Sequence, residues 1–162
     1  ILCRLSQVIS LFIFQLCRIG FYKKNIMELL KKIDKNTNVL TWFEIPVTDT
    51  ERAKTFYETI LDIEMVKRED GNDEAVFFPF DPNIVQATSG RVAGVLSKTE
   101  RNSPSGNGTI VYINASPNID AVLNKVEQAG GKIIAPKTLI PAGYIAIILD
   151  TEGNRIGLHA EK

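Results

Sequence analysis

Hydrophobic and polar positions alternate with the period of a strand and then with that of a helix, and this sequence of patterns occurs twice. Residues 39–47 are rich in β-branched and aromatic side chains, which favours a strand. The next apolar positions recur at helical spacing and are Ala53, Phe56, Tyr57 and Ile60. Three further strands are expected between turn-rich segments, at 63–68, 75–80 and 92–97.

The first helix has a predicted start. Thr48 is the expected N-cap, because Glu51 three residues later completes a capping box. Tyr57 and Phe56 are expected in the core, where the helix packs on a sheet.

The same pattern restarts after the polar segment 98–108, which is rich in Ser, Pro, Gly and Asn. Ser116 and Pro117 form the expected cap and first turn of a second helix, which Gly130 and Gly131 should end. Its apolar positions are Ile119, Val122, Leu123 and Val126. The strands expected around this helix are 109–114, 132–135, 144–149 and 155–159.

Two βαβββ units therefore indicate one domain with an internal repeat. The chain is long enough for a substantial core but too short for two independent domains. The expected organisation is a lead-in at 27–37 and a domain at 38–162, divided into repeat one at 38–97, a linker at 98–108 and repeat two at 109–162.

The first 26 residues differ from the rest. The apolar run from Val8 to Leu16 is about half as long as a membrane-spanning helix. It has a basic residue before it, as a secretory signal does, but no small-residue cleavage site after it. We interpret residues 1–26 as translated upstream sequence or a tag preceding Met27, and a signal or anchor is the alternative.

Composition narrows the class of partner. The 19 basic residues balance the 19 acidic ones, so no net charge favours nucleic acid. Both cysteines, Cys3 and Cys17, precede the domain, which is therefore left without a thiol for a disulfide, a zinc site or a nucleophile. A cytoplasmic domain without membrane association is expected.

Three motifs carry a resemblance to a family. They are residues 42–57 (WFEIPVTDTERAKTFY), 128–131 (QAGG) and 150–156 (DTEGNRI). In this order they resemble the vicinal-oxygen-chelate superfamily of glyoxalases, bleomycin-resistance proteins and extradiol dioxygenases, over residues 38–162. The resemblance implies an α+β fold, in which two βαβββ repeats form a cupped mixed β-sheet cleft with helices on the outer face.

The resemblance also locates the metal ligands of the family's enzymes, which are His, Gln or Glu. The corresponding positions fall on Trp42, Val111 and Gly157, and near Val95, so none can bind a metal. The single histidine, His159, cannot assemble a site that needs several ligands. No metal and no cofactor are therefore expected.

Side chains two apart on a strand share a face. If Trp42 and Gly157 face the cleft, then Glu44, Arg155 and His159 face it too. The predicted ligand-binding residues are Trp42, Glu44, Val111, Tyr144, Arg155, Gly157 and His159. The predicted catalytic candidates, if there is a reaction, are His159 and Glu44.

Each assignment has a structural alternative. Glu44 and Arg155 would then form only an ion pair, His159 would be a hydrogen-bonded structural residue, and Trp42 would fill the space of a metal. Asp150, Gly153 and Asn154 are interpreted as turn residues that serve backbone geometry.

Three functions remain open. The first is metal-independent binding of a small organic molecule. The second is a glyoxalase-like lyase or isomerase, in which Glu44 and His159 move protons across one shared cavity. The third is an interaction module that keeps only the fold, which the absence of a ligand-sized pocket would favour. By resemblance a homodimer is expected, and the open face of a half-covered sheet gives a physical motive for it.

Overall fold

A computed structural model describes residues 33–70, 73–85 and 89–161, and the predictions for residues 1–26 lie outside them. The chain divides into two compact units, residues 1–37 and 38–162. No helix in the described part is long and apolar enough to cross a membrane. Every element named below belongs to the second unit.

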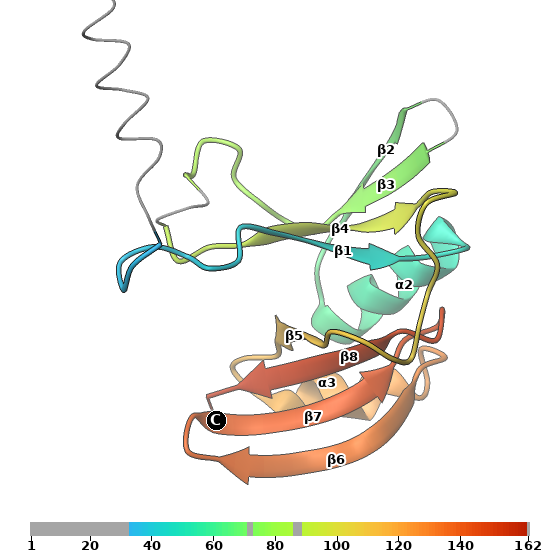
Figure 1. The fold of residues 1–162 in the computed structure, drawn as a ribbon. Coiled ribbons are helices and arrows are strands. Elements are labelled where there is room, and N and C mark those ends of the chain that lie inside the picture. Colours follow the sequence, from blue (N-terminus) through green and yellow to red (C-terminus); the bar gives the residue numbers. More distant parts are fainter. Residues whose placement is uncertain (1–32, 71–72, 86–88, 162) are drawn as a thin grey trace, which may run out of the picture. The chain divides into compact units, whose positions relative to one another are not determined.

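The first repeat folds as the predicted βαβββ unit (Figure 1). Its sheet has the order β1-β4-β3-β2, in which β1 runs parallel to β4 and the other neighbours are antiparallel. The elements are β1 (Trp42–Pro46), α2 (Thr50–Leu61), β2 (Val66–Asp70), β3 (Asp73–Phe77) and β4 (Ala93–Lys98).

The second repeat has the same topology, with the order β5-β8-β7-β6 and β5 parallel to β8. The predicted α+β fold of two βαβββ repeats is thus confirmed. Its elements are β5 (Val111–Asn114), α3 (Ile119–Val126), β6 (Lys132–Ile140), β7 (Gly143–Leu149) and β8 (Arg155–Ala160).

Both helix caps differ from the prediction. The carboxylate of Asp49 caps α2 by accepting from the backbone N–H of Arg52 at 3.0 Å, so Thr48 is not the N-cap. Asn118, and not Ser116, caps α3 by accepting from the N–H of Asp120 at 2.9 Å. In both cases an Asx side chain one or two residues further along takes the position, because it reaches the free N–H groups of the first turn.

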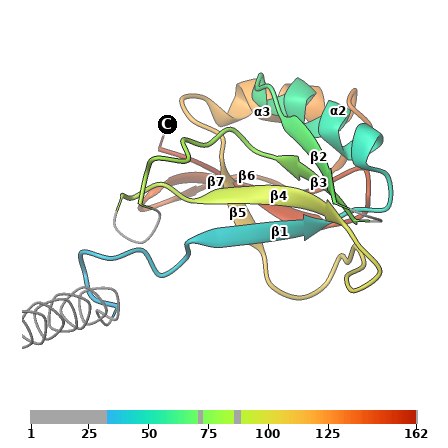
Figure 2. The same ribbon diagram turned by 90° about the horizontal axis from the view of Figure 1, so that it is seen from above.

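The core lies between the sheets and the helices, which cover one side (Figure 2). The alternation along β1 shows how a strand divides its residues, because Ile45 is buried under the helices whereas Trp42 and Glu44 are exposed on the other side. One face of each sheet is consequently core, and the opposite face is left open.

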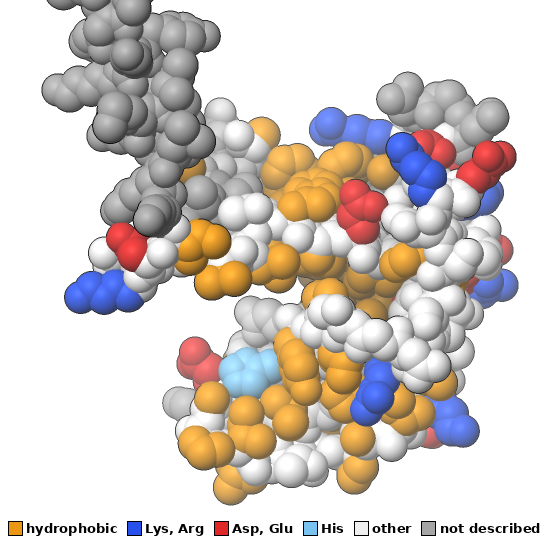
Figure 3. Space-filling model, viewed as in Figure 1, with side chains coloured by type: hydrophobic (Ala, Val, Ile, Leu, Met, Phe, Trp, Pro, Cys, Tyr) orange, Lys and Arg blue, Asp and Glu red, His pale blue; other side chains and the backbone are white. Residues whose placement is uncertain are grey.

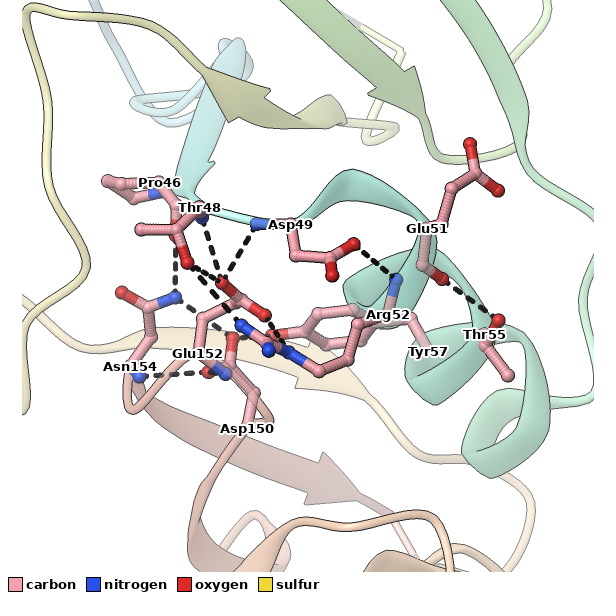
Figure 4. A network of polar contacts seen from close by, with 10 residues as sticks. All are labelled: Pro46, Thr48, Asp49, Glu51, Arg52, Thr55, Tyr57, Asp150, Glu152 and Asn154. Carbon is pink, nitrogen blue, oxygen red and sulfur yellow. Dashed lines mark hydrogen bonds and ion pairs between the residues drawn. The ribbon is translucent and has the colours of Figure 1, made fainter.

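A buried polar network joins the two repeats (Figure 4). The Tyr57 hydroxyl, from α2, donates to the Asp150 carboxylate after β7 at 2.8 Å. Asn154 donates through Nδ2 to Asp150 at 3.0 Å and to the carbonyl of Pro46 at 2.7 Å. Burial, and then the charge of Asp150, raises the pKa of Tyr57 well above its usual range, so the hydroxyl keeps the proton it donates.

Glu152 holds the junction of β1 and α2 from the other repeat. Its carboxylate accepts from the Thr48 hydroxyl at 2.6 Å and from two backbone N–H groups, those of Thr48 at 2.8 Å and Asp49 at 3.1 Å. It also pairs with Nε of Arg52 at 2.6 Å. The interpretation of residues 150–154 as a turn alone is therefore incomplete, because three of its side chains bind the first repeat. Gly153, with φ of 86°, does serve turn geometry.

Replacing Tyr57 with Phe removes one hydrogen bond to a buried carboxylate while keeping the ring. We expect the free energy of unfolding to fall by about 1.5–3 kcal/mol, because Asp150 loses a donor that water cannot replace. Urea denaturation measures this. The matched control is Tyr112→Phe at an exposed tyrosine, which should change the stability by less than about 0.5 kcal/mol. Equal losses of unfolding free energy in the two variants would contradict the conclusion that this network stabilises the contact between the two repeats.

The lowered pKa of Glu152 predicts that the contact between the two repeats weakens in acid. Burial opposes ionisation, but hydrogen bonds from Arg52, Thr48 and Asp49 outweigh it and lower the pKa of Glu152 to about 2. A carboxyl with a lowered pKa in the folded state stabilises the protein above its unfolded pKa, which is about 4.3, and that stability is lost as the pH falls towards 2.

We expect Glu152→Gln to flatten the decline of unfolding free energy across this acid range, by up to about 1.4 kcal/mol per pH unit. Thermal unfolding between pH 5 and 2 measures it. The control Glu64→Gln, at an exposed carboxylate, should leave the decline unchanged. Parallel curves for wild type and Glu152→Gln would refute the assignment.

Candidate functional site

The open face of the first sheet carries a hollow of about 410 Å³. The register places Glu44 beside Val95 and Val95 beside Phe77, so three adjacent strands contribute one row of side chains to this face. Arg68 on β2 and Trp42 on β1 lie on the same face and line the hollow at either side. Figure 3 views this open side, where hydrophobic side chains gather over both sheets.

Aromatic rings form one wall of this first-sheet hollow. Trp42 meets Phe77 edge to face, with ring centroids 6.0 Å apart. Behind this wall the Phe80 ring, which does not line the hollow, lies 5.8 Å from that of Phe77. The guanidinium of Arg68 lies 5.0 Å above the centre of the Phe77 ring, in a cation–π contact. Trp42 is 40% exposed and lines the hollow beside it.

Most charges around the hollow are already paired. Arg101 contacts Asp73 at 2.8 Å. Glu74 accepts from Lys67 at 2.7 Å, from Lys98 at 2.5 Å and from the Thr50 hydroxyl at 2.6 Å.

The hydrogen bonds to Glu74 from Lys67, then Lys98, then Thr50 lower its pKa to about 2. In contrast, the side chains of Glu44 and Arg68 have no ion pair or hydrogen bond with any residue that the structure describes. These two are the charges left to a ligand.

A second hollow, of about 360 Å³, lies on the open face of the second sheet. Its lining is mostly apolar and comprises Tyr112, Asn114, Ile140, Ile145 and His159. The Tyr112 ring lies over Gly157, where an added Cβ would come within 2.5 Å of a ring carbon, so Gly157 makes room for this ring.

His159 is engaged by the turn between β6 and β7. Its Nε2 lies 3.0 Å from the carbonyl oxygen of Ala142. Because a carbonyl only accepts, Nε2 is the protonated nitrogen in this contact. His159 lines the second-sheet hollow, whereas Glu44 lines the first-sheet hollow.

Two predicted site residues do not lie where the sequence placed them. Tyr144 pairs with Ala160 and packs against the core, so it belongs to the helix-covered face, and Lys137 lies 4.2 Å above its ring. Val111 pairs with Ile156, which is buried, whereas the next residue, Tyr112, pairs with Gly157. The reason is the two-residue period of a strand, which turns a one-residue error of register into a change of face.

Glu44, Val111 and Arg155 meet elsewhere, at a smaller hollow of about 160 Å³ between the two repeats. Glu44 and Arg155 both line it, but they form no ion pair. The ion pair offered as the structural alternative for these two residues is therefore not seen among the described residues. Glu44 consequently borders the first-sheet hollow on one side and this small hollow on the other.

The residues of the open faces do not fit a divalent metal. Trp42, Val95 and Gly157 have no side chain that can bind a metal, and Val111 lies on the core side of β5 and not on the open face. Among the described residues no three His, Cys, Asp or Glu side chains come close enough to hold an ion. Hard divalent metals need several oxygen or imidazole ligands, which these faces do not supply.

Sequence reasoning did not single out Phe77, Arg68 or Tyr112. Alternation along β3 was a usable signal for Phe77, because it lies on a predicted strand of the first repeat. The neighbours of Phe77 could not be read in the same way, since they come from strands far apart in the chain.

Comparison with known proteins supports one family. Residues 39–158 match the family model described as "Glyoxalase/Bleomycin resistance protein/Dioxygenase superfamily". The comparison with curated proteins found no significant match.

Solved structures share the fold at low sequence identity. A hypothetical protein of S. aureus, SA1046, is 19% identical with a TM-score of 0.56, covering 83% of this chain and 98% of that one. TnmS3, an antibiotic binding protein from Streptomyces sp. CB03234, is 22% identical with a TM-score of 0.56, covering 76% and 95%. Glyoxalase I from Zea mays is 20% identical with a TM-score of 0.54, covering 74% of this chain but only 45% of that one.

Proposed function

This chain belongs to the Glyoxalase/Bleomycin resistance protein/Dioxygenase superfamily, and we propose that it binds a small organic molecule in the first-sheet hollow without a metal. One observation carries the proposal: the aromatic wall of Trp42 and Phe77 shares the hollow with two charged side chains, Glu44 and Arg68, that no described residue neutralises. Polar groups around an apolar wall are the usual composition of a small-molecule site.

The size of the hollow supports this. A volume of about 410 Å³ falls within the range of roughly 300–1,000 Å³ that is typical of small-molecule sites. This space also weighs against a module that retains only the fold, because such a module requires no pocket of ligand size. The similarity to TnmS3, which is an antibiotic binding protein, is compatible with an organic ligand.

The lyase or isomerase alternative receives less support from the geometry. It needs Glu44 and His159 on either side of one substrate, and these residues line separate hollows. The Nε2 proton of His159 is also directed at a backbone carbonyl.

The cysteine distribution bears on localisation. Because residues 38–162 contain no cysteine, a cytoplasmic protein remains the proposal.

Binding can be followed with the protein's own fluorescence, because Trp42 is the single tryptophan of the sequence and lines the hollow. We expect compounds from a library of aromatic acids and amines to change its emission and to raise the melting temperature. Phe77→Ala, which removes the opposing ring, should weaken such binding by about tenfold or more, since stacking on an aromatic wall is lost. Tyr112→Ala, on the other sheet, is the matched control.

Divalent metals complete the test. We expect nickel, zinc, manganese and iron to bind below stoichiometric amounts by elemental analysis and to leave the melting temperature unchanged. Stoichiometric metal with a clear rise in melting temperature would refute a metal-independent site and place the enzyme alternative first. A library without any compound that alters Trp42 emission or melting temperature would refute binding in this hollow.

We also propose that the protein is a homodimer. The open faces carry exposed apolar side chains, among them Val66, Phe80 and Tyr112, which a second copy would remove from water. Sedimentation equilibrium should give twice the mass of the chain. Because the contact is apolar, high salt should not dissociate it. A monomer at all concentrations would overturn the proposal.

A further inference from the structure

We infer that the ligand of the first-sheet hollow is a zwitterionic aromatic compound, with a flat ring against Trp42 and Phe77, a cationic group at Glu44 and an anionic group at Arg68. The inference rests on the proposed function and narrows it to a chemical class. It follows from the state of the charges around the hollow and from their separation across the sheet.

Arg68 offers a positive charge with free donors. The Phe77 ring holds its guanidinium from one face, at 5.0 Å, and this contact leaves the N–H groups at the edge of the guanidinium unused. Arg101, the other arginine of this hollow, already contacts the carboxylate of Asp73 at 2.8 Å. An incoming anionic group would therefore bind at Arg68, where a planar carboxylate can accept two parallel hydrogen bonds.

Glu44 offers the complementary negative charge. The other acidic side chains that line the hollow are Asp73, which pairs with Arg101, and Glu74, which accepts from two lysines. Glu44 alone among these three has no partner in the described structure. A cationic nitrogen placed there would gain an ion pair without displacing one.

Glu44 and Arg68 form no ion pair with each other. Glu44 lies on β1 and Arg68 on β2, the two outer strands of the order β1-β4-β3-β2. Adjacent strands are about 4.8 Å apart, so the two backbones are separated by about 14 Å. Across the sheet Glu44 is followed by Val95, Phe77 and Val66. Arg68 lies one row along, opposite Ala75, and its guanidinium reaches back over the Phe77 ring, so an apolar ring would lie over Val95 and Phe77.

A ligand that fills the hollow removes water from the side chains of Glu44 and Arg68 at once. A ligand with one charge would leave the opposite side chain desolvated without a partner, which costs affinity. A neutral ligand would leave both in that state. A ring with opposite charges at its two ends satisfies each side chain and covers the aromatic wall between them.

The test compares three probes that share one ring: 4-(aminomethyl)benzoate, which is zwitterionic, benzylamine, which is only cationic, and benzoate, which is only anionic. Trp42 emission and isothermal titration calorimetry give their dissociation constants at low ionic strength, where charge pairs are screened least. The zwitterion should bind at least tenfold more tightly than either singly charged probe.

Two variants assign the ends. Glu44→Gln should weaken the zwitterion and benzylamine by at least fivefold and leave benzoate unchanged. Arg68→Gln should weaken the zwitterion and benzoate by the same factor and leave benzylamine unchanged. The matched controls are Glu64→Gln and Arg91→Gln, at exposed residues outside the hollow, and both should change all three constants by less than twofold.

The outcomes separate this inference from the proposed function. If one singly charged probe binds as tightly as the zwitterion, or if each variant weakens all probes equally, the inference is overturned while binding in the hollow stands. The same holds if none of the three probes binds but a singly charged aromatic acid or amine from the library does. If neither the probes nor the library affect Trp42 emission or melting temperature, both fail.

Discussion

The two repeats depend on a small set of buried hydrogen bonds between one turn and one helix start. The Asp150 carboxylate receives the hydroxyl of Tyr57, and the Glu152 carboxylate receives the backbone N–H groups that precede α2. Inside a protein such groups are costly unless they are satisfied, so these contacts allow few other arrangements of the two repeats. The apolar contact between α2 and α3 adds area, but the polar contacts determine how the parts fit.

The arrangement of the two repeats leaves one face of each sheet uncovered. Because both helices pack on the same side and touch each other, the opposite face of each sheet remains open. Strand alternation then assigns each residue to the core or to the open face, so Ile45 is buried in the core whereas its neighbour Glu44 is exposed on the open face. The same backbone thus supports a conventional core and a chemically different open face.

The open face of the first sheet combines aromatic rings with charged side chains. Trp42 and Phe77 meet edge to face, Arg68 lies over the Phe77 ring, and Glu44 lies beside Val95 on the same face. None of these aromatic and charged side chains is in the hydrophobic core, so the chemistry of this face can vary without loss of core packing. The binding proposed above would depend on ring contact and on charge placement, which the register of β1, β4, β3 and β2 fixes.

By itself the sequence determined the repeats, the order of strands and helices and the core positions, because periodicity and residue type are local properties. It also identified Trp42 and Glu44 as neighbours on one face. Only the tertiary structure decided that Tyr144 and Val111 lie on the core side of their strands. It also decided that Arg68 and Phe77 line the first-sheet hollow, and that Glu44 and His159 line separate hollows. Those facts depend on register between strands distant in the chain, and a shift of one residue reverses the face of every side chain.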